Sequence, residues 1–119
     1  MIYPASIKSY RYQNGSDFFF SASAGPVLVL EGPLVLKSFS YCLCRSTNIE
    51  TPASIQLFDG ETELFKTGLA NRIGYYPSYG SVVVPGVGIR IKESLRVGID
   101  DFDLSGSAQC HNLNIGYQK

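Results

Sequence analysis

Short apolar runs, separated by glycine and proline, set the pattern of the chain from residue 17 onward. Residues 18–20 are three phenylalanines, residues 27–31 form a short apolar run, and residues 34–45 form the longest run. A Gly-Pro pair lies between each of these runs and the next. Runs of this length, rich in aromatic and β-branched residues and bounded by turn residues, predict β-strands.

The clearest local signal is a hairpin in the middle of the chain. Residues 53–58 and residues 61–66 both alternate apolar and polar positions, and Asp59-Gly60 lies between them. An Asp-Gly pair in this context favours a type I′ turn, because both central residues of that turn need a positive φ. We therefore expect these two runs to pair as antiparallel strands.

The C-terminal half continues the same alternation. Strands are predicted at residues 81–84, 87–92, 95–99 and 111–117, and the last of these should be central because it must be held on both sides. No apolar pattern of helical period persists over three turns. The chain is therefore predicted to be all-β: an antiparallel, jelly-roll-like sandwich of about eight strands with an extended N-terminal arm.

Two tyrosine-rich segments lie outside the predicted strands. Residues 1–16 have no sustained period and are predicted to be an arm that docks on a neighbouring subunit, with a frayed terminus as the alternative. The sandwich domain is predicted to span residues 17–119. Residues 68–80 are predicted to be a loop whose rings contact a partner or a sugar, or cover the open end of the sandwich. The candidate interface residues are Tyr3, Tyr10, Tyr12, Tyr75, Tyr76 and Tyr79.

Composition narrows the classes of function. The 119 residues suit one domain, and ten basic residues balance ten acidic ones. No segment is markedly basic, so we expect no nucleic-acid partner. The longest apolar stretch is too short to span a bilayer, and no signal peptide is visible, so we expect no membrane partner. The three cysteines are expected to be reduced thiols.

Candidate chemistry is sparse. The single histidine, His111, is expected to share a strand face with Leu113 and Ile115 as a structural residue. A zinc site built from His111 with Cys42, Cys44 and Cys110 is conceivable, but its spacing lacks the usual C-x2-C pair. The acidic run Asp100, Asp101 and Asp103 lacks the spacing of a calcium loop and is expected to be a solvated turn. We predict no catalytic residue, no metal site and no cofactor.

The chain from Gly32 to the C-terminus resembles small jelly-roll proteins of tailed-bacteriophage virions. Four segments carry the resemblance: Leu36-Lys37-Ser38-Phe39-Ser40, Ser54-Ile55-Gln56-Leu57-Phe58-Asp59-Gly60, Val82-Val83-Val84-Pro85-Gly86-Val87-Gly88-Ile89 and Ser94-Leu95-Arg96-Val97. Such proteins commonly carry a strand leading into an LYDG-like hairpin, a Pro-Gly strand break and an alternating pair of strands. This chain departs from the usual pattern of these proteins in its cysteine content.

The resemblance implies a non-enzymatic structural part of a virion, assembled in the host cytoplasm. A capsid cement or decoration protein that stabilises the shell is the first expectation, and a head-fibre or tail-fibre module is the alternative. Such a protein would contact the major capsid protein and copies of itself, as a dimer or trimer. A carbohydrate- or receptor-binding sandwich stays open, although tryptophan is absent. A cupin-type enzyme would need more histidines.

Overall fold

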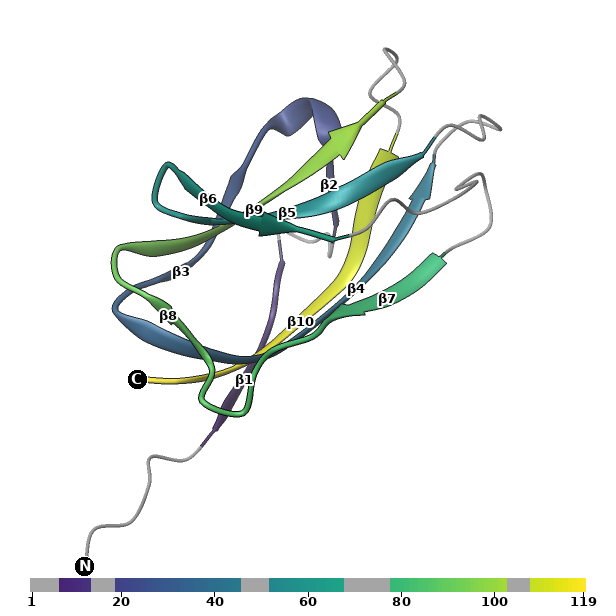
Figure 1. Cartoon of the computed structure of the whole chain (residues 1–119). Helices are drawn as coiled ribbons and strands as arrows, with labels where there is room; N and C mark the ends of the chain where they lie inside the picture. The colour runs from purple at the N-terminus through teal and green to yellow at the C-terminus, as the bar shows by residue number, and fades with distance from the viewer. Residues whose placement is uncertain (1–6, 14–18, 46–51, 68–77, 103–107) are drawn as a thin grey trace, which may run out of the picture.

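The computed structural model is a sandwich of two antiparallel β-sheets (Figure 1). It describes residues 7–13, 19–45, 52–67, 78–102 and 108–119. We name the sheets after their central strands. The β10 sheet contains β1 (Lys8–Arg11), β2 (Phe19–Ser21), β4 (Leu34–Arg45), β7 (Ser78–Val82), β8 (Ile89–Ile91) and β10 (Ala108–Gln118). The β9 sheet contains β3 (Val27–Glu31), β5 (Ala53–Asp59), β6 (Thr62–Lys66) and β9 (Ser94–Asp101). The all-β sandwich predicted from the sequence is confirmed.

The strand order is that of a jelly roll. In the β10 sheet, β10 and β4 are the inner pair, β1 and β2 share one edge, and β7 and β8 share the other. The β9 sheet has the order β3-β9-β5-β6. Along the chain, the consecutive strands β1 and β2, β5 and β6, and β7 and β8 belong to the same sheet, and every other pair of consecutive strands lies in different sheets. Two four-position sheets connected in this way are the double Greek key of a jelly roll.

The core lies between the sheets and follows the predicted alternation. Leu95, Val97 and Ile99 of β9 are buried, as are Leu36 and Phe39 of β4. Burial of each such side chain stabilises the fold by about 1.5–3 kcal/mol. The apolar faces of the two sheets therefore supply the main driving force for the sandwich, without any disulfide among the described cysteines.

The predicted β5–β6 hairpin is present, but its turn lies one residue later than expected. Asp59 pairs with Thr62, so Gly60 and Glu61 are the central residues. Gly60 has φ +60°, whereas Glu61 is not among the residues with positive φ. A positive φ at the first central position alone is the pattern of a type II′ turn rather than type I′.

β10 is central, as predicted, but it contains a bulge that the sequence pattern did not reveal. His111 pairs with Cys42 and Asn114 pairs with Ser40, which leaves one extra residue in β10. Asn112 adopts φ 52°, a left-handed conformation that asparagine tolerates better than most residues. The extra residue reverses the alternation, so Leu113 is buried while His111 is only half-buried. The expectation that His111 shares a face with Leu113 and Ile115 is therefore wrong.

The N-terminal segment is part of the sandwich over its described residues. β1 pairs with β10 from Lys8 to Arg11, and Tyr12 donates its backbone N–H to Leu113 O at 3.0 Å. Tyr12 is 8% exposed, and its ring meets the edge of Phe20 at 5.5 Å between centroids. Residues 8–12 therefore extend the β10 sheet, and the side chains of Tyr10 and Tyr12 pack against the core.

Candidate functional site

The most exposed apolar side chains of the described residues lie on the connection between β7 and β8. We call residues 83–88 the valine loop. Val83 is 92% exposed and Val87 is 86% exposed, and Pro85 and Gly86 between them are exposed as well. The sequence pattern placed Val83 and Val87 in strands, whereas β7 ends at Val82 and β8 begins at Ile89. Two unpaired valines on an exposed loop are a candidate contact surface.

Contacts at its base hold the valine loop against β4. Gly88 donates its N–H to Pro85 O at 2.8 Å, and the Lys37 ammonium donates to Gly86 O at 3.1 Å. Gly88 has φ +85°, and a Cβ at this position would collide with Val35 and with Leu36 O. The two valines contribute none of these contacts, so they are free to meet a partner while the backbone is already positioned.

The outer face of the β10 sheet carries a hollow of about 350 Å³. Gly116 forms part of its lining, and it lies between Ser9 of β1 and Ser38 of β4 in the strand register. The next row consists of Arg11, Asn114 and Ser40. The Arg11 guanidinium donates to Asn112 Oδ1, which orients it along β10. Hydroxyl, amide and guanidinium groups therefore line one shallow site.

This sheet is also basic. Its strands contain five basic residues and no Asp or Glu, and Lys119 directly follows β10. The basic residues are Lys8, Arg11, Lys37, Arg45 and Arg90. Arg45 is buried, whereas Lys8, Arg11, Arg90 and Lys119 are exposed. The zero net charge of the chain thus conceals an uneven distribution that no single segment of the sequence shows.

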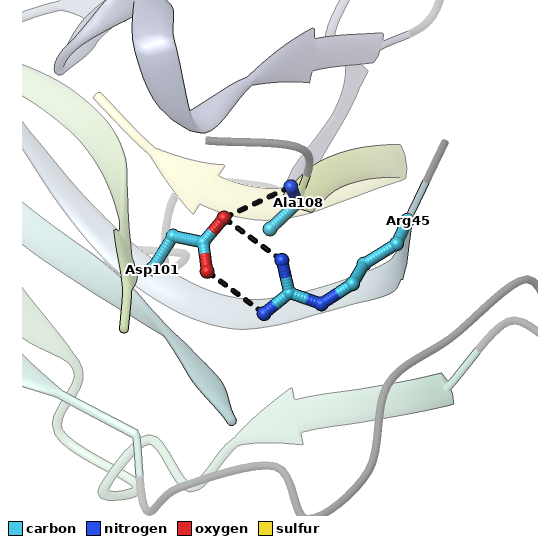
Figure 2. Close-up of polar contacts among 3 residues, drawn as sticks. All are labelled: Arg45, Asp101 and Ala108. Carbon is cyan, nitrogen blue, oxygen red and sulfur yellow. Dashed lines mark hydrogen bonds and ion pairs between the residues drawn. The ribbon is translucent and has the colours of Figure 1, made fainter. Parts of the chain in front are cut away.

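A buried ion pair joins the two sheets at the opposite end from the valine loop (Figure 2). The Arg45 guanidinium at the end of β4 donates to both carboxylate oxygens of Asp101 at the end of β9, at 2.8 and 3.0 Å. The Ala108 N–H donates to the same carboxylate at 3.0 Å. Asp100 and Asp101 are the last two residues of β9, so the predicted solvated turn is wrong for both. Arg45 lies on the same inward face of β4 as Phe39 and Leu43. Its position in this alternation could have predicted from the sequence that Arg45 is buried.

The six tyrosines predicted as interface residues have different positions. Tyr12 is buried in the core, and burial raises the pKa of its phenol. Tyr10 is half-buried and packs against the core. Tyr79 lies in β7 opposite Cys42, and only its backbone is described. Tyr3, Tyr75 and Tyr76 lie outside the described residues. The three described tyrosines, Tyr10, Tyr12 and Tyr79, lie on strands at opposite edges of the β10 sheet or follow them, so they do not form one site.

The cysteines and His111 lie on the neighbouring strands β4 and β10, where His111 pairs with Cys42 and Cys110 lies close to Cys42 and Cys44. Cys110 belongs to the core, where burial raises the pKa of its thiol to about 12. Cys42 and Cys44 lie two residues apart on β4, and burial raises the pKa of Cys44 as well. Burial lowers the pKa of His111, which contacts Gln109 Oε1 through Nε2 at 3.1 Å. Thiols with raised pKa values are poor nucleophiles and poor metal ligands at neutral pH.

Within the described ranges, no group of three or more His, Cys, Asp or Glu side chains is arranged to hold a metal ion. The same part of the chain contains no helix long and apolar enough to cross a membrane. Comparisons with protein-family models, with curated proteins and with solved structures found no match to this chain. The argument about function below therefore starts from the valine loop.

Proposed function

We propose that this protein is a non-enzymatic structural component of a tailed-phage virion, a capsid cement or decoration protein that stabilises the shell by protein–protein contacts. The observation that carries the proposal is the exposure of Val83 and Val87, at 92% and 86%. A pair of exposed apolar side chains on a positioned loop is suited to filling pockets on a protein partner. The jelly-roll topology agrees with the fold that the resemblance implies.

The partner in this proposal is the major capsid protein, with further contacts between copies of the chain. Burying two valine side chains contributes enough free energy to change affinity by at least about tenfold. A head-fibre or tail-fibre module would present the same loop to a different virion component. The two roles therefore differ in what the loop binds.

Binding to empty shells tests the proposal. Shells of the phage that encodes the chain, prepared without it, are mixed with the purified protein and sedimented, and their disruption temperature is measured by calorimetry. We expect saturable co-sedimentation and a higher disruption temperature. The double variant Val83→Ser/Val87→Ser should bind at least about tenfold more weakly.

The matched control is Leu28→Ser, which alters an exposed apolar side chain of β3 in the other sheet. It should bind shells as the unaltered protein does. Absence of co-sedimentation, or shell binding that is insensitive to the double valine change, would refute the proposal. Binding to purified fibres but not to shells would favour the fibre module.

A further inference from the structure

The outer face of the β9 sheet carries a hollow of about 280 Å³ beside the β5–β6 turn. Phe58 of β5 pairs with Arg96 of β9, so the two side chains project from the same face of the sheet. Leu57, the neighbour of Phe58, is buried in the core, which places Phe58 and Arg96 on the outer face. The residues that line the hollow are Pro26, Phe58, Gly60, Glu61 and Arg96.

The Phe58 ring extends along the sheet toward Gly98, which has no side chain to cover it. A Cβ at Gly98 would lie 3.4 Å from Phe58 Cε2 and 3.5 Å from Pro26 Cγ. The two rings therefore flank a stretch of bare backbone. Phe58 is half-buried and Pro26 is exposed, so both present apolar surface to solvent. An aromatic ring on a rigid strand is suited to stacking against a ligand.

The two charged groups in the lining have no polar partner within the described part of the chain. The Arg96 guanidinium is half-buried, the Glu61 carboxylate is exposed, and neither forms a hydrogen bond or an ion pair with another described residue. They line the same hollow with opposite charges, yet no ion pair joins them. The hollow therefore holds hydrogen-bond donors and acceptors apart, with space for a ligand between them.

A neutral ligand with several hydroxyl groups suits this arrangement. A hydroxyl both donates and accepts, so neighbouring hydroxyls of one sugar ring can satisfy Arg96 and Glu61 together. An anion would be repelled by Glu61 and by Glu63, which pairs with Phe58, and a cation would be repelled by Arg96. The C–H face of a pyranose supplies the apolar surface that packs on the Phe58 ring.

We propose that this hollow binds a neutral pyranose sugar, with the sugar ring stacked on Phe58 and its hydroxyls hydrogen-bonded to Arg96 and Glu61. Its volume is below the range of about 300–1,000 Å³ that is typical of small-molecule sites, so it takes a single ring and binds with a Kd of about 1 mM or weaker. The valine loop connects strands of the other sheet, so the sugar site and the proposed shell contact occupy different surfaces.

Titration with simple sugars tests the proposal. The ¹⁵N-labelled protein is titrated separately with methyl glucopyranoside, methyl galactopyranoside and methyl mannopyranoside to about 50 mM, well above the expected Kd. We expect at least one sugar to cause saturable shifts of the Gly60, Arg96 and Gly98 amide signals. Phe58→Leu keeps an apolar side chain without the ring, and Arg96→Gln removes the guanidinium. Each should weaken binding about tenfold.

Phe102→Leu is the matched control, because it makes the same change at a 49% exposed phenylalanine that directly follows β9. It should bind the sugar as the unaltered protein does. Circular dichroism and thermal melting establish that the variants fold, and Arg96→Gln keeps the test decisive if Phe58→Leu does not. Phe58→Leu should still co-sediment with shells, so failure of the sugar site and failure of the proposed function are separate outcomes.

Three results would overturn the proposal. The three glycosides differ in the orientation of their hydroxyls, so the absence of saturable shifts with all of them would exclude a pyranose site. Shifts that are insensitive to both Phe58→Leu and Arg96→Gln would place the binding elsewhere on the molecule. Saturable shifts of the Arg96 and Gly98 signals with glycine, and with none of the glycosides, would assign the hollow to a zwitterionic ligand instead.

Discussion

The two ends of the sandwich each use one carboxylate to hold backbone N–H groups, but in different environments. At one end, Asp101 accepts from Arg45 and Ala108, and the Arg45 and Asp101 side chains are 0% and 4% exposed. At the other end, Asp59 accepts from the N–H groups of Lys92, Glu93 and Ser94 at 2.9, 2.8 and 3.4 Å. Asp59 is only half-buried, and no cation among the described residues forms an ion pair with it.

The difference shows how burial determines the free energy of unfolding that is lost when a carboxylate loses its partners. A buried carboxylate must be matched by a cation, and removing that cation leaves an uncompensated charge at low dielectric. An accessible carboxylate can exchange its protein partners for water at little cost. We therefore expect the Arg45–Asp101 end to be much more sensitive to substitution than the Asp59 end, although both carboxylates accept three hydrogen bonds.

The largest expected effect is at the buried end. Arg45→Ala should lower the free energy of unfolding by about 3–5 kcal/mol, because it leaves Asp101 charged and buried. Arg45→Lys keeps the charge but loses the two parallel hydrogen bonds, so it should cost less than Arg45→Ala. Urea denaturation monitored by circular dichroism measures both values. Equal stability of Arg45→Ala and the unaltered chain would show that this end of the sandwich is open to water.

A smaller effect is expected at the accessible end. Asp59→Asn retains one acceptor oxygen but removes the charge, and it should lower the free energy of unfolding by about 1 kcal/mol. The same urea titration measures it beside Arg45→Ala. A loss as large as that of Arg45→Ala would contradict the comparison between the two ends.

Acid should act through Asp59. Hydrogen bonds from the backbone of Lys92 and Glu93 lower its pKa below the ordinary value of 3.8. Because the folded state has the lower pKa, Asp59 stabilises the fold above the unfolded value, and this contribution is lost as the pH falls through the folded value. The stability difference between the unaltered chain and Asp59→Asn should therefore shrink as the pH falls below about 4. A difference that stays constant as the pH is lowered from about 5 to about 2 would contradict this assignment.

The sequence predicted those parts of the fold that residues of strong conformational preference delimit. The bounds of β3 and β4 agree with the predicted runs because Gly25-Pro26 and Gly32-Pro33 interrupt the chain there. The bulge in β10 was missed because the extra residue, Asn112, lies between the polar residues His111 and Asn114. One more polar residue there does not visibly interrupt the alternation. The burial of Tyr12 was not predicted because the edge strand beside it is short. So few residues do not form an alternating pattern long enough to indicate a strand.

The candidate site was less predictable, because it depends on how distant segments meet. Val83 and Val87 read as strand residues, since valine favours strands wherever it occurs. A run of consecutive apolar residues before Pro85 could have indicated that some of them face solvent, because alternate residues of a strand point to opposite faces. The hollow on the β10 sheet combines residues from separate strands, such as Ser9, Ser38 and Asn114, and only the sheet topology brings these together.

The smallest expected effect concerns a second buried polar group near the Arg45–Asp101 end. Ser54 lies on β5 opposite Asp100, its side chain is fully buried, and its Oγ has no hydrogen-bond partner within the described part of the chain. An unsatisfied buried hydroxyl is destabilising, whereas alanine fills nearly the same volume without the polar atom. Ser54→Ala should therefore raise the free energy of unfolding by about 0.5–1 kcal/mol, measured by urea denaturation beside Arg45→Ala. A loss of stability would instead show that the Ser54 hydroxyl has a hydrogen-bond partner in solution. Burial at this end of the sandwich would then destabilise only those polar groups that lack a partner.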